Sequence, residues 1–525
     1  MTEVALEALL RDAHQLHRLG RVPEAIEAYT RILALRADLA ECWFNLGVLL
    51  RQQRQFTEAL SAYQRALDNG ISGPEEVYLN RGVIYADFLR QDAAAEQELK
   101  RALQLNPNYI PALLNLANLQ EDLGNRSEAG GLYERILTLD ASCLEALARY
   151  ANLQPAASAD DRVIAQLQGA LRAPASAAER ASILFALGRL LDGKQQFAAA
   201  FEAYTAANAN SRASAAPGHG IYDRKRQEEL VDQLISACPE TRSSGAAPTG
   251  EAAVAGESAP TGEAAAAGEA RPSDRGSRPV RAASRAETGP QPIFICGLFR
   301  SGSTLAEQLL AGHPQVVAGG ELDILQRLSA AVPSARALAA ASPDLLASLA
   351  NTYRDELRRM FPGASYVTDK RPDNFLHVGL IKRLFPDSRI VHTTRDPLDN
   401  CLSIFFLHLD HSMGYALNLL DIGHYFRQYR RLMAHWQRCY GADLFELHYD
   451  SFVRQPAREA ARLFNFLGLE WDERYLAVES RREAVKTASV WQVREPIYTR
   501  SSGRAAHYAT QLRELREYLA DLLPK

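Results

Sequence analysis

Small residues recur at a nearly constant interval through the first 153 residues of the chain. The intervals are 34, 35, 35 and 34 residues, at Ala13, Gly47, Gly82, Ala117 and Ala151. Small side chains let two helices approach closely. A repeat of this length is typical of a helical hairpin that buries its apolar face only against its neighbours. The spacing therefore predicts a stack of paired helices.

A second set of fixed spacings accompanies the small residues. An alanine follows the first four small residues after 12 positions, and an aromatic ring that would fill the gap to the next hairpin follows after 16. The positions are Ala25, Ala59, Ala94 and Ala129 for alanine, and Tyr29, Tyr63, Glu98 and Tyr133 for the ring, with Glu98 as a departure. The pattern resembles the tetratricopeptide repeat, an all-α superhelix. We expect such repeats over residues 1–153 and further irregular helical repeats over 154–240, where Gly188, Ala200 and Tyr204 restore the rhythm.

This resemblance implies a peptide or protein partner, because the concave face of such a stack usually holds one. Asn45, Asn80 and Asn115 recur every 35 residues. This ladder could grip a peptide backbone or could bond neighbouring helices. The alternative for the whole stack is a structural spacer or an oligomerisation surface.

The composition changes abruptly after the repeats. Residues 241–290 are rich in Ala, Gly, Ser, Pro and Glu and have no apolar periodicity. Such a segment cannot bury enough apolar surface to offset the entropy of ordering. We predict a disordered low-complexity linker, with a functional basic arm at 271–285 as the alternative.

The final part of the chain, residues 291–525, begins with a phosphate-binding pattern. An apolar run at 293–296 predicts a buried strand, and a loop from Gly297 to Gly302 leads into a helix start, where backbone N–H groups converge on an anion. Gly297, Gly302 and Thr304 have P-loop spacing, but Ser303 stands where the lysine that reaches β/γ-phosphates would be. Arg300 places a cation inside the loop. The loop therefore favours a nucleotide without a γ-phosphate.

Strands and helices alternate after this loop, which predicts an α/β domain with a parallel sheet. Strands are expected at 293–296, 366–368, 389–394 and 444–449, and helices at 303–311, 343–360, 375–384, 399–408, 422–438 and 457–466. Arg395 follows the third strand, at the edge where open α/β sheets bind ligands. With Ser403 at the next helix start, it suits a second phosphate. A salt bridge from Arg395 to Asp396 or Asp399 is the alternative.

Together these segments resemble the sulfotransferases from residue 292 to about 508, and the repeat-fused architecture matches a bacterial subgroup related to tyrosylprotein sulfotransferases. The resemblance implies an α/β P-loop-like domain. It also implies 3′-phosphoadenosine-5′-phosphosulfate as co-substrate and no metal. By resemblance, the 5′-phosphosulfate is held by Arg300, Ser301, Gly302, Ser303 and Thr304, and the 3′-phosphate by Arg395 and Ser403. Tyr449 would contact the adenosine phosphate.

Residues 487–508 resemble the C-terminal segment of this family. Ser489 would face the transferring sulfuryl group, and the nucleotide would be covered by Ser501, Gly503 and Arg504. Relatives commonly have tryptophan after the Gly-Arg pair, where this chain has Ala505.

Sulfuryl transfer needs a base near the acceptor hydroxyl and a cation near the leaving phosphate. The resemblance assigns the base to Glu321, in GGELDIL, and the cation to Lys370, in TDKRPDN. Alternatively, Glu321 is an acid at a helix start and Lys370 a surface lysine paired with Asp369.

The totals for the whole chain narrow the class of protein. A formal net charge of −4 indicates neither nucleic-acid nor membrane binding. The six cysteines are dispersed, the N-terminus lacks a basic signal-peptide region, and no apolar run is long enough to span a membrane. We expect a cytoplasmic sulfotransferase. Two alternatives are a protein-binding scaffold with an inactive nucleotide-binding domain, and a P-loop kinase.

Overall fold

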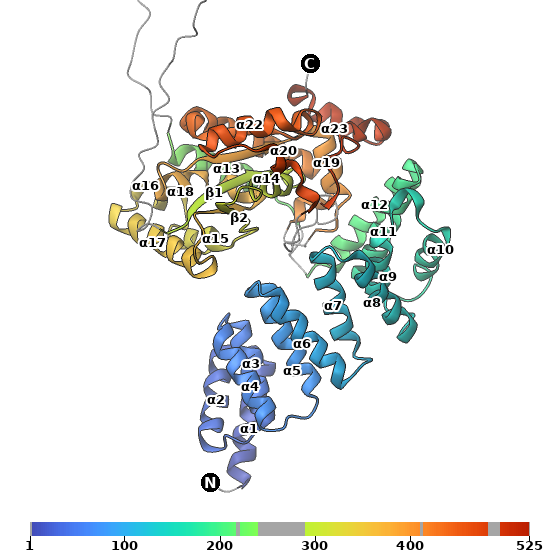
Figure 1. Ribbon diagram of the computed structural model, residues 1–525, viewed down its shortest axis with the longest axis vertical. Coiled ribbons are helices and arrows are strands. Elements are labelled where there is room, and N and C mark those ends of the chain that lie inside the picture. Colours follow the sequence, from blue (N-terminus) through green and yellow to red (C-terminus); the bar gives the residue numbers. More distant parts are fainter. Residues whose placement is uncertain (1–2, 217–220, 240–288, 410–412, 481–493, 524–525) are drawn as a thin grey trace, which may run out of the picture.

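The computed structural model describes residues 3–216, 221–239, 289–409, 413–480 and 494–523 of the chain. A curved stack of helices precedes a domain built on a five-stranded parallel sheet, as predicted (Figure 1). The predicted linker at 241–290 lies almost entirely outside the described residues, so its disorder stays a prediction.

The first four hairpins form the predicted stack. Their helices are α1 (Glu3–Arg18), α2 (Val22–Leu35), α3 (Ala40–Gln52), α4 (Phe56–Asp68), α5 (Pro74–Val83), α6 (Asp92–Leu105), α7 (Ile110–Asp122) and α8 (Arg126–Leu139). A Cβ added to Gly47 would lie 2.7 Å from the ring of Tyr63, so the small residue is what lets the ring pack. Tyr29 and Tyr133 are likewise fully buried.

The third hairpin departs from the predicted register. A π-helical turn, η1 (Ile84–Phe88), follows α5 and takes up one extra residue before α6. Ala95, and not Ala94, is therefore the fully buried alanine of this hairpin. Leu99, and not Glu98, packs where an aromatic ring stands in the other hairpins. Both sequence predictions were wrong by one residue.

Two contacts confirm this shift. A Cβ on Gly82 would lie 2.9 Å from Leu99, which is the counterpart of the contact between Gly47 and Tyr63. Glu98 is also buried, but its carboxylate lies 3.0 Å from Arg81 and 2.8 Å from Arg101. These two guanidinium groups offset the cost of burying its charge.

Further helices extend the stack: α9 (Leu144–Leu153), α10 (Asp161–Ala170), α11 (Ala177–Gly193) and α12 (Phe197–Ser214). The next helix, α13 (Arg224–Ala237), packs against α20 (Leu419–Tyr440) of the sheet domain. Its Arg224 lies 2.7 Å from Asp421 on α20, and Val231 is buried in the same core. The grouping of residues 224–237 with the repeats is therefore corrected.

The strands lie in the order β2-β3-β1-β4-β5, and every neighbouring pair is parallel. They are β1 (Gln291–Gly297), β2 (Val316–Val317), β3 (Tyr366–Lys370), β4 (Ile390–Thr394) and β5 (Leu444–His448). Strand β2 was not predicted, because two residues show no periodicity. Four of the five strands were.

Helices cover both faces of the sheet. Ile293 and Ile295 of the central strand β1 pack with α14 (Ser303–Leu310) and α22 (Pro456–Leu467). Phe294 and Cys296 belong to the larger core, which is formed with α17 (Pro343–Met360), α18 (Val378–Leu384) and α20. A strand buried on both faces needs a continuous apolar run, which is the pattern seen in the sequence.

The other helices of the sheet domain agree with their predicted bounds to different degrees. Helix α17 has the predicted bounds, whereas the helix predicted at 375–384 is a short 3₁₀ turn followed by α18. Helix α19 (Pro397–Phe405) begins two residues earlier than predicted, because the Asp396 side chain caps it. Short helices not predicted are α15 (Ile324–Ser329), α16 (Ala335–Ala340), α21 (Tyr449–Arg454) and α23 (Arg513–Tyr518).

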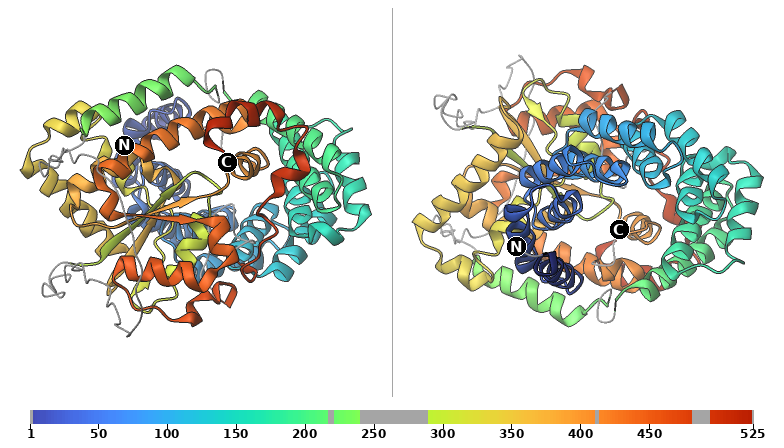
Figure 2. Two further views of the ribbon diagram at one scale, coloured as in Figure 1. Left: turned by 90° about the horizontal axis from the view of Figure 1, so that it is seen from above. Right: turned by 90° about the horizontal axis from the view of Figure 1, so that it is seen from below.

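The repeats pack directly on the sheet domain and curve around one side of it (Figure 2). The rings of Tyr204 on α12 and Phe406 after α19 stack at 3.8 Å between centroids. The amide of Asn208 donates to the carbonyl of Phe405 at 2.8 Å. The two regions are therefore joined by a packed interface as well as by the chain. Within the described residues, no helix has the length and apolar character needed to cross a membrane.

Candidate active site

The glycine loop lies between β1 and α14, at the carboxyl edge of the sheet. A Cβ on Gly297 would lie 2.5 Å from the carbonyl oxygen of Thr393 on the neighbouring strand. Gly302 has φ of 101°, and a Cβ there would lie 2.8 Å from the ring of Tyr449. The Oγ of Ser301 donates to the carbonyl of Leu298 at 2.6 Å, which closes the turn. The loop thus requires glycine at both ends.

Two guanidinium groups meet beside this loop. Arg300 has φ of 67°, and its Nε donates to the Oγ of Ser403 at 3.1 Å. Arg395 donates to the carbonyl of Arg300 at 3.2 Å, and its guanidinium lies 5.0 Å from the centre of the Tyr449 ring. Burial and the nearby Arg395 lower the pKa of Arg300 to about 10. Two cations held this close inside a protein indicate a site for an anion.

The buried Nε of Arg395 makes no hydrogen bond within the part of the chain that the structure describes. A buried donor without a partner is costly unless a ligand or water accepts a hydrogen bond from it. Three residues assigned to the two phosphates by resemblance, Arg300 on the loop, Arg395 after β4 and Ser403 on α19, are joined by the hydrogen bonds given above. A nucleotide with two anionic groups fits this donor set.

Among the described residues, no ion pair within 4.0 Å joins Arg395 to Asp396 or Asp399, the partners in the alternative interpretation. Asp396 accepts hydrogen bonds from the backbone N–H groups of Leu398 and Asp399 and thereby caps α19. Asp399 is buried, and it accepts from the N–H groups of Gly503 and Ala505. Burial raises its pKa, and the hydrogen bond from Ala505 and the charge of Arg395 oppose that rise. Asp399 thus holds the C-terminal segment against the site, a role that the sequence did not reveal.

Glu321 and Lys370 lie together at the carboxyl end of β3. The Nζ of Lys370 is 2.7 Å from Oε1 of Glu321. The lysine side chain is 1% exposed and the glutamate side chain 35% exposed. Asp369, the partner in the alternative interpretation of Lys370, instead accepts from Tyr353 and Asn374. Lys370 is therefore a buried cation with a solvent-reachable carboxylate beside it.

A third charged residue of this cluster, Glu307, was missed by sequence reasoning. It lies on α14, is 3% exposed, and accepts from the Thr368 hydroxyl at 2.6 Å and from the Gly320 N–H at 2.9 Å. Burial raises its pKa, and the nearby charge of Lys370 opposes that rise. In the sequence Glu307 is an ordinary acid on an amphipathic helix, so no local signal marks it.

Two glycines position the Glu321 segment. A Cβ on Gly319 would lie 2.0 Å from the carbonyl oxygen of Thr368, and Gly320 has φ of 68°. The carbonyl of Gly320 accepts from the Lys370 N–H at 2.9 Å. The Gly-Gly pair is thus what allows this segment to lie against β3 and to present Glu321 next to Lys370.

Two of the three C-terminal residues assigned to the nucleotide by resemblance, Ser501 and Gly503, are held beside Arg395 and Asp399. The carbonyl of Ser501 accepts from Arg395, and Gly503 is held by Asp399. The guanidinium of Arg504 pairs with the repeats, where it lies 2.6 Å from Asp192 of α11. Ser489 lies outside the described residues.

Tyr449 also differs from its prediction. It is the first residue of α21, one position beyond strand β5. Its ring lies against Gly302 and Arg395, so it faces the loop.

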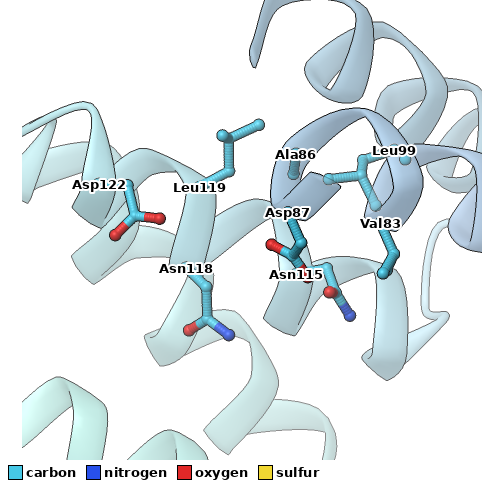
Figure 3. Close-up of a pocket in the computed structure, with 9 residues that line it drawn as sticks. Val83, Ala86, Asp87, Leu99, Asn115, Asn118, Leu119 and Asp122 are labelled. Carbon is cyan, nitrogen blue, oxygen red and sulfur yellow. The ribbon is translucent and has the colours of Figure 1, made fainter. Parts of the chain in front are cut away.

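A small pocket of about 100 Å³ lies in the repeats (Figure 3). It is lined by Gly82, Val83, Ala86, Asp87, Leu99, Asn115, Asn118, Leu119 and Asp122. Asn115, a member of the asparagine ladder, donates to the carbonyl of Pro111 in its own helix, and Asn80 does the same to Glu76. In both residues the amide nitrogen thus bonds its own helix and not a neighbouring one. No group of metal-ligating side chains occurs among the described residues.

Comparison with known proteins agrees with this architecture. A model of the sulfotransferase family matches residues 292–473. Models of the tetratricopeptide repeat match residues 10–74, 44–110 and 112–147. An uncharacterized protein of Aquifex aeolicus (strain VF5) is 26% identical over 497 residues, which cover 90% of this chain and 58% of that protein. The chain thus spans little more than half the length of this relative.

Solved structures with similarity to parts of the chain include both domain types. The sulfotransferase domain from the Synechococcus PCC 7002 olefin synthase is 22% identical and covers 46% of this chain and 98% of its own, with a TM-score of 0.34. YrrB, a tetratricopeptide repeat protein with an unusual peptide-binding site, is 18% identical and covers 37% of this chain and 89% of its own, with a TM-score of 0.26.

Proposed function

We propose that this chain, which joins tetratricopeptide repeats to a sulfotransferase-family domain, moves a sulfuryl group from 3′-phosphoadenosine-5′-phosphosulfate to a hydroxyl group of a peptide or protein. The observation that carries the proposal is the meeting of Arg300 and Arg395 beside a P-loop-like turn that has Ser303 in place of lysine. This site provides two cations for two separate anionic groups and lacks the lysine that a triphosphate needs.

The donor-binding roles follow from these positions. The backbone N–H groups of the loop and the start of α14, with Arg300, Ser301, Gly302, Ser303 and Thr304, would hold the 5′-phosphosulfate. Arg395 and Ser403 would hold the 3′-phosphate, which would accept a hydrogen bond from the otherwise unbonded Nε of Arg395. Tyr449 would pack beside the nucleotide.

The donor supplies an activated sulfuryl group, and the chain supplies charge and proton transfer around it. Lys370, a buried cation, would stabilise negative charge on the leaving phosphate. Glu321, which solvent can reach, would take the proton of the attacking hydroxyl. Ser489 would face the transferred group. Lys370, Glu321 and Ser489 are the proposed catalytic residues.

Residues 501–504 would cover the nucleotide mainly through their backbone. Ser501 and Gly503 would line the nucleotide through their backbone, because Arg395 and Asp399 hold them at the site. Arg504 would reach the nucleotide only after leaving Asp192. The repeats would recruit the acceptor, and we propose a cytoplasmic location.

Binding of the donor product tests the proposal without an acceptor. Isothermal calorimetry would compare adenosine 3′,5′-bisphosphate, AMP and ATP with magnesium on the full chain. We expect the bisphosphate to bind at least about a hundredfold more tightly than AMP, because only it carries the 3′-phosphate. Tighter binding of magnesium-ATP would favour the kinase alternative. Bisphosphate binding without any sulfuryl transfer to proteins would favour the scaffold alternative.

A further inference from the structure

Three consecutive hairpins touch the sheet domain through the same part of their structure. The turn between the two helices of each hairpin has one residue in a left-handed conformation: Arg54 at φ 60°, Arg90 at φ 54° and Gly124 at φ 82°. Arg54 lies 2.8 Å from Asp323. Gly124 adjoins Arg494, which donates to the carbonyl of Asp122 at 2.6 Å. One edge of the repeat stack thus lies along the side of the site that carries Glu321, which we call the acceptor side.

Arg90, in the middle of this edge, packs on the segment that carries Glu321. A Cβ added to Gly320 would lie 2.9 Å from Nη1 of Arg90 and 3.2 Å from its Nη2. The N–H of Gly320 donates to Glu307, and its carbonyl accepts from the N–H of Lys370. The guanidinium of Arg90 therefore covers a backbone unit that connects three charged residues of the site.

The charges of this cluster are complementary to Arg90. The buried carboxylate of Glu307 is faced by Lys370 from the sheet and by Arg90 from the repeats. The left-handed conformation is unfavourable for a residue that has a Cβ, and glycine is the usual occupant, as at Gly124 in the next hairpin. An arginine at this turn is consistent with a role for its side chain.

We propose that Arg90 is a positioning residue, supplied by the repeats, that fixes the Gly319–Gly320 turn and so holds Glu321 beside Lys370. The acceptor side of the catalytic site is then complete only when the repeats are docked. The inference rests on the proposed role of Glu321, but the contact itself can be tested without that role.

The test uses Arg90→Gly in the full chain, which removes the guanidinium and leaves a residue that tolerates the turn. Gln195→Gly is the matched control, because Gln195 has φ of 60° at the corresponding turn between α11 and α12. The first measurement is hydrogen–deuterium exchange of peptides covering residues 316–325. We expect exchange at least about fivefold faster in Arg90→Gly and unchanged in Gln195→Gly. Equal exchange in both variants would overturn the proposal.

The second measurement separates positioning from general stability. Radiolabelled 3′-phosphoadenosine-5′-phosphosulfate and naphthol, a small phenol, serve as donor and acceptor. We expect kcat to fall about tenfold or more in Arg90→Gly with the affinity for adenosine 3′,5′-bisphosphate unchanged, and millimolar guanidinium to restore part of the rate. A rate equal to that of Gln195→Gly would overturn the positioning role. If the parent chain transfers nothing to naphthol, lysate protein replaces it as acceptor, and failure with that acceptor too would contradict the proposed function. The exchange measurement decides in either case whether Arg90 holds the segment.

Discussion

The Nζ of Lys370 and Oε1 of Glu321 are 2.7 Å apart, yet the lysine side chain is 1% exposed and the glutamate side chain 35% exposed. The pair joins a cation enclosed by the sheet domain to a carboxylate at its surface. Under the proposed function, the lysine would act on a bound donor and the glutamate on an arriving acceptor. Substitutions of the two residues should have different effects.

Lys370→Ala should weaken binding of adenosine 3′,5′-bisphosphate roughly tenfold or more, because it removes a buried charge that we propose contacts the 5′-phosphate. Lys382→Ala is the matched control. Lys382 is also buried and ion-paired, at 2.9 Å from Asp443, but it lies on α18. Calorimetry should show unchanged affinity for the control. Equal affinity losses in both variants would remove Lys370 from the donor site.

Arg300→Ala should also weaken binding of the bisphosphate. A charge-assisted hydrogen bond contributes about 1.5–3 kcal/mol, or roughly tenfold to a hundredfold in Kd. Arg389→Ala serves as the control, since Arg389 precedes β4 at the edge of the sheet away from the loop and lies over the Phe466 ring at 5.4 Å. The role of Arg300 would be rejected if calorimetry gave the parent Kd.

Asp192→Ala should destabilise the interface between the repeats and the sheet domain. Asp192 lies 2.6 Å from Arg504 and accepts a hydrogen bond from the Tyr508 hydroxyl. Its removal leaves the largely buried charge of Arg504 without this partner. The expected loss is about 2–3 kcal/mol. Asp161→Ala, which removes a carboxylate that is 86% exposed in its pair with Lys194, should cost less than about 1 kcal/mol. Unfolding followed by calorimetry would compare them, and equal losses would contradict the interface role.

The buried carboxyl group of Asp369 should make the free energy of unfolding depend on pH. Burial raises its pKa to about 7, above the ordinary value of 3.8. Between these values the folded chain binds a proton that the unfolded chain has released, so stability falls as the pH rises from about 4 to about 7 and is flat above that. The contribution is on the order of 4 kcal/mol. Asp369→Asn should remove this fall, as measured by the difference in melting temperature between the two proteins across the range. Parallel curves would show that Asp369 is ionised throughout.

Much of the fold could be predicted because its signals are local. The 34-residue spacing, the apolar run of β1 and the glycine loop each lie within a short stretch of sequence. The register error at Ala94 and Glu98 arose because a π-helical turn adds a residue without any sequence mark. Helix α13 was misassigned because its partner α20 lies about two hundred residues further along the chain.

Family resemblance could point to those site residues that lie in recognisable motifs. It could not point to residues whose contacts are with distant segments of the chain. The sequence pattern points to Arg300, Arg395, Glu321 and Lys370. Glu307, Asp399 and Asp192 have no local signature, because their importance comes from burial and from partners on distant segments. The direction of Arg504 could not be foreseen for the same reason.

The most direct measurement is sulfuryl transfer by the full chain and by Glu321→Gln. Each would be incubated with radiolabelled 3′-phosphoadenosine-5′-phosphosulfate and lysate proteins, and labelled products would be identified by mass spectrometry. The account predicts labelled protein from the parent chain, and a rate at least about a hundredfold lower for the variant with bisphosphate affinity within about twofold. Transfer by Glu321→Gln at the parent rate would contradict the proposed base, and no transfer by the parent chain to any acceptor would contradict the proposed enzyme.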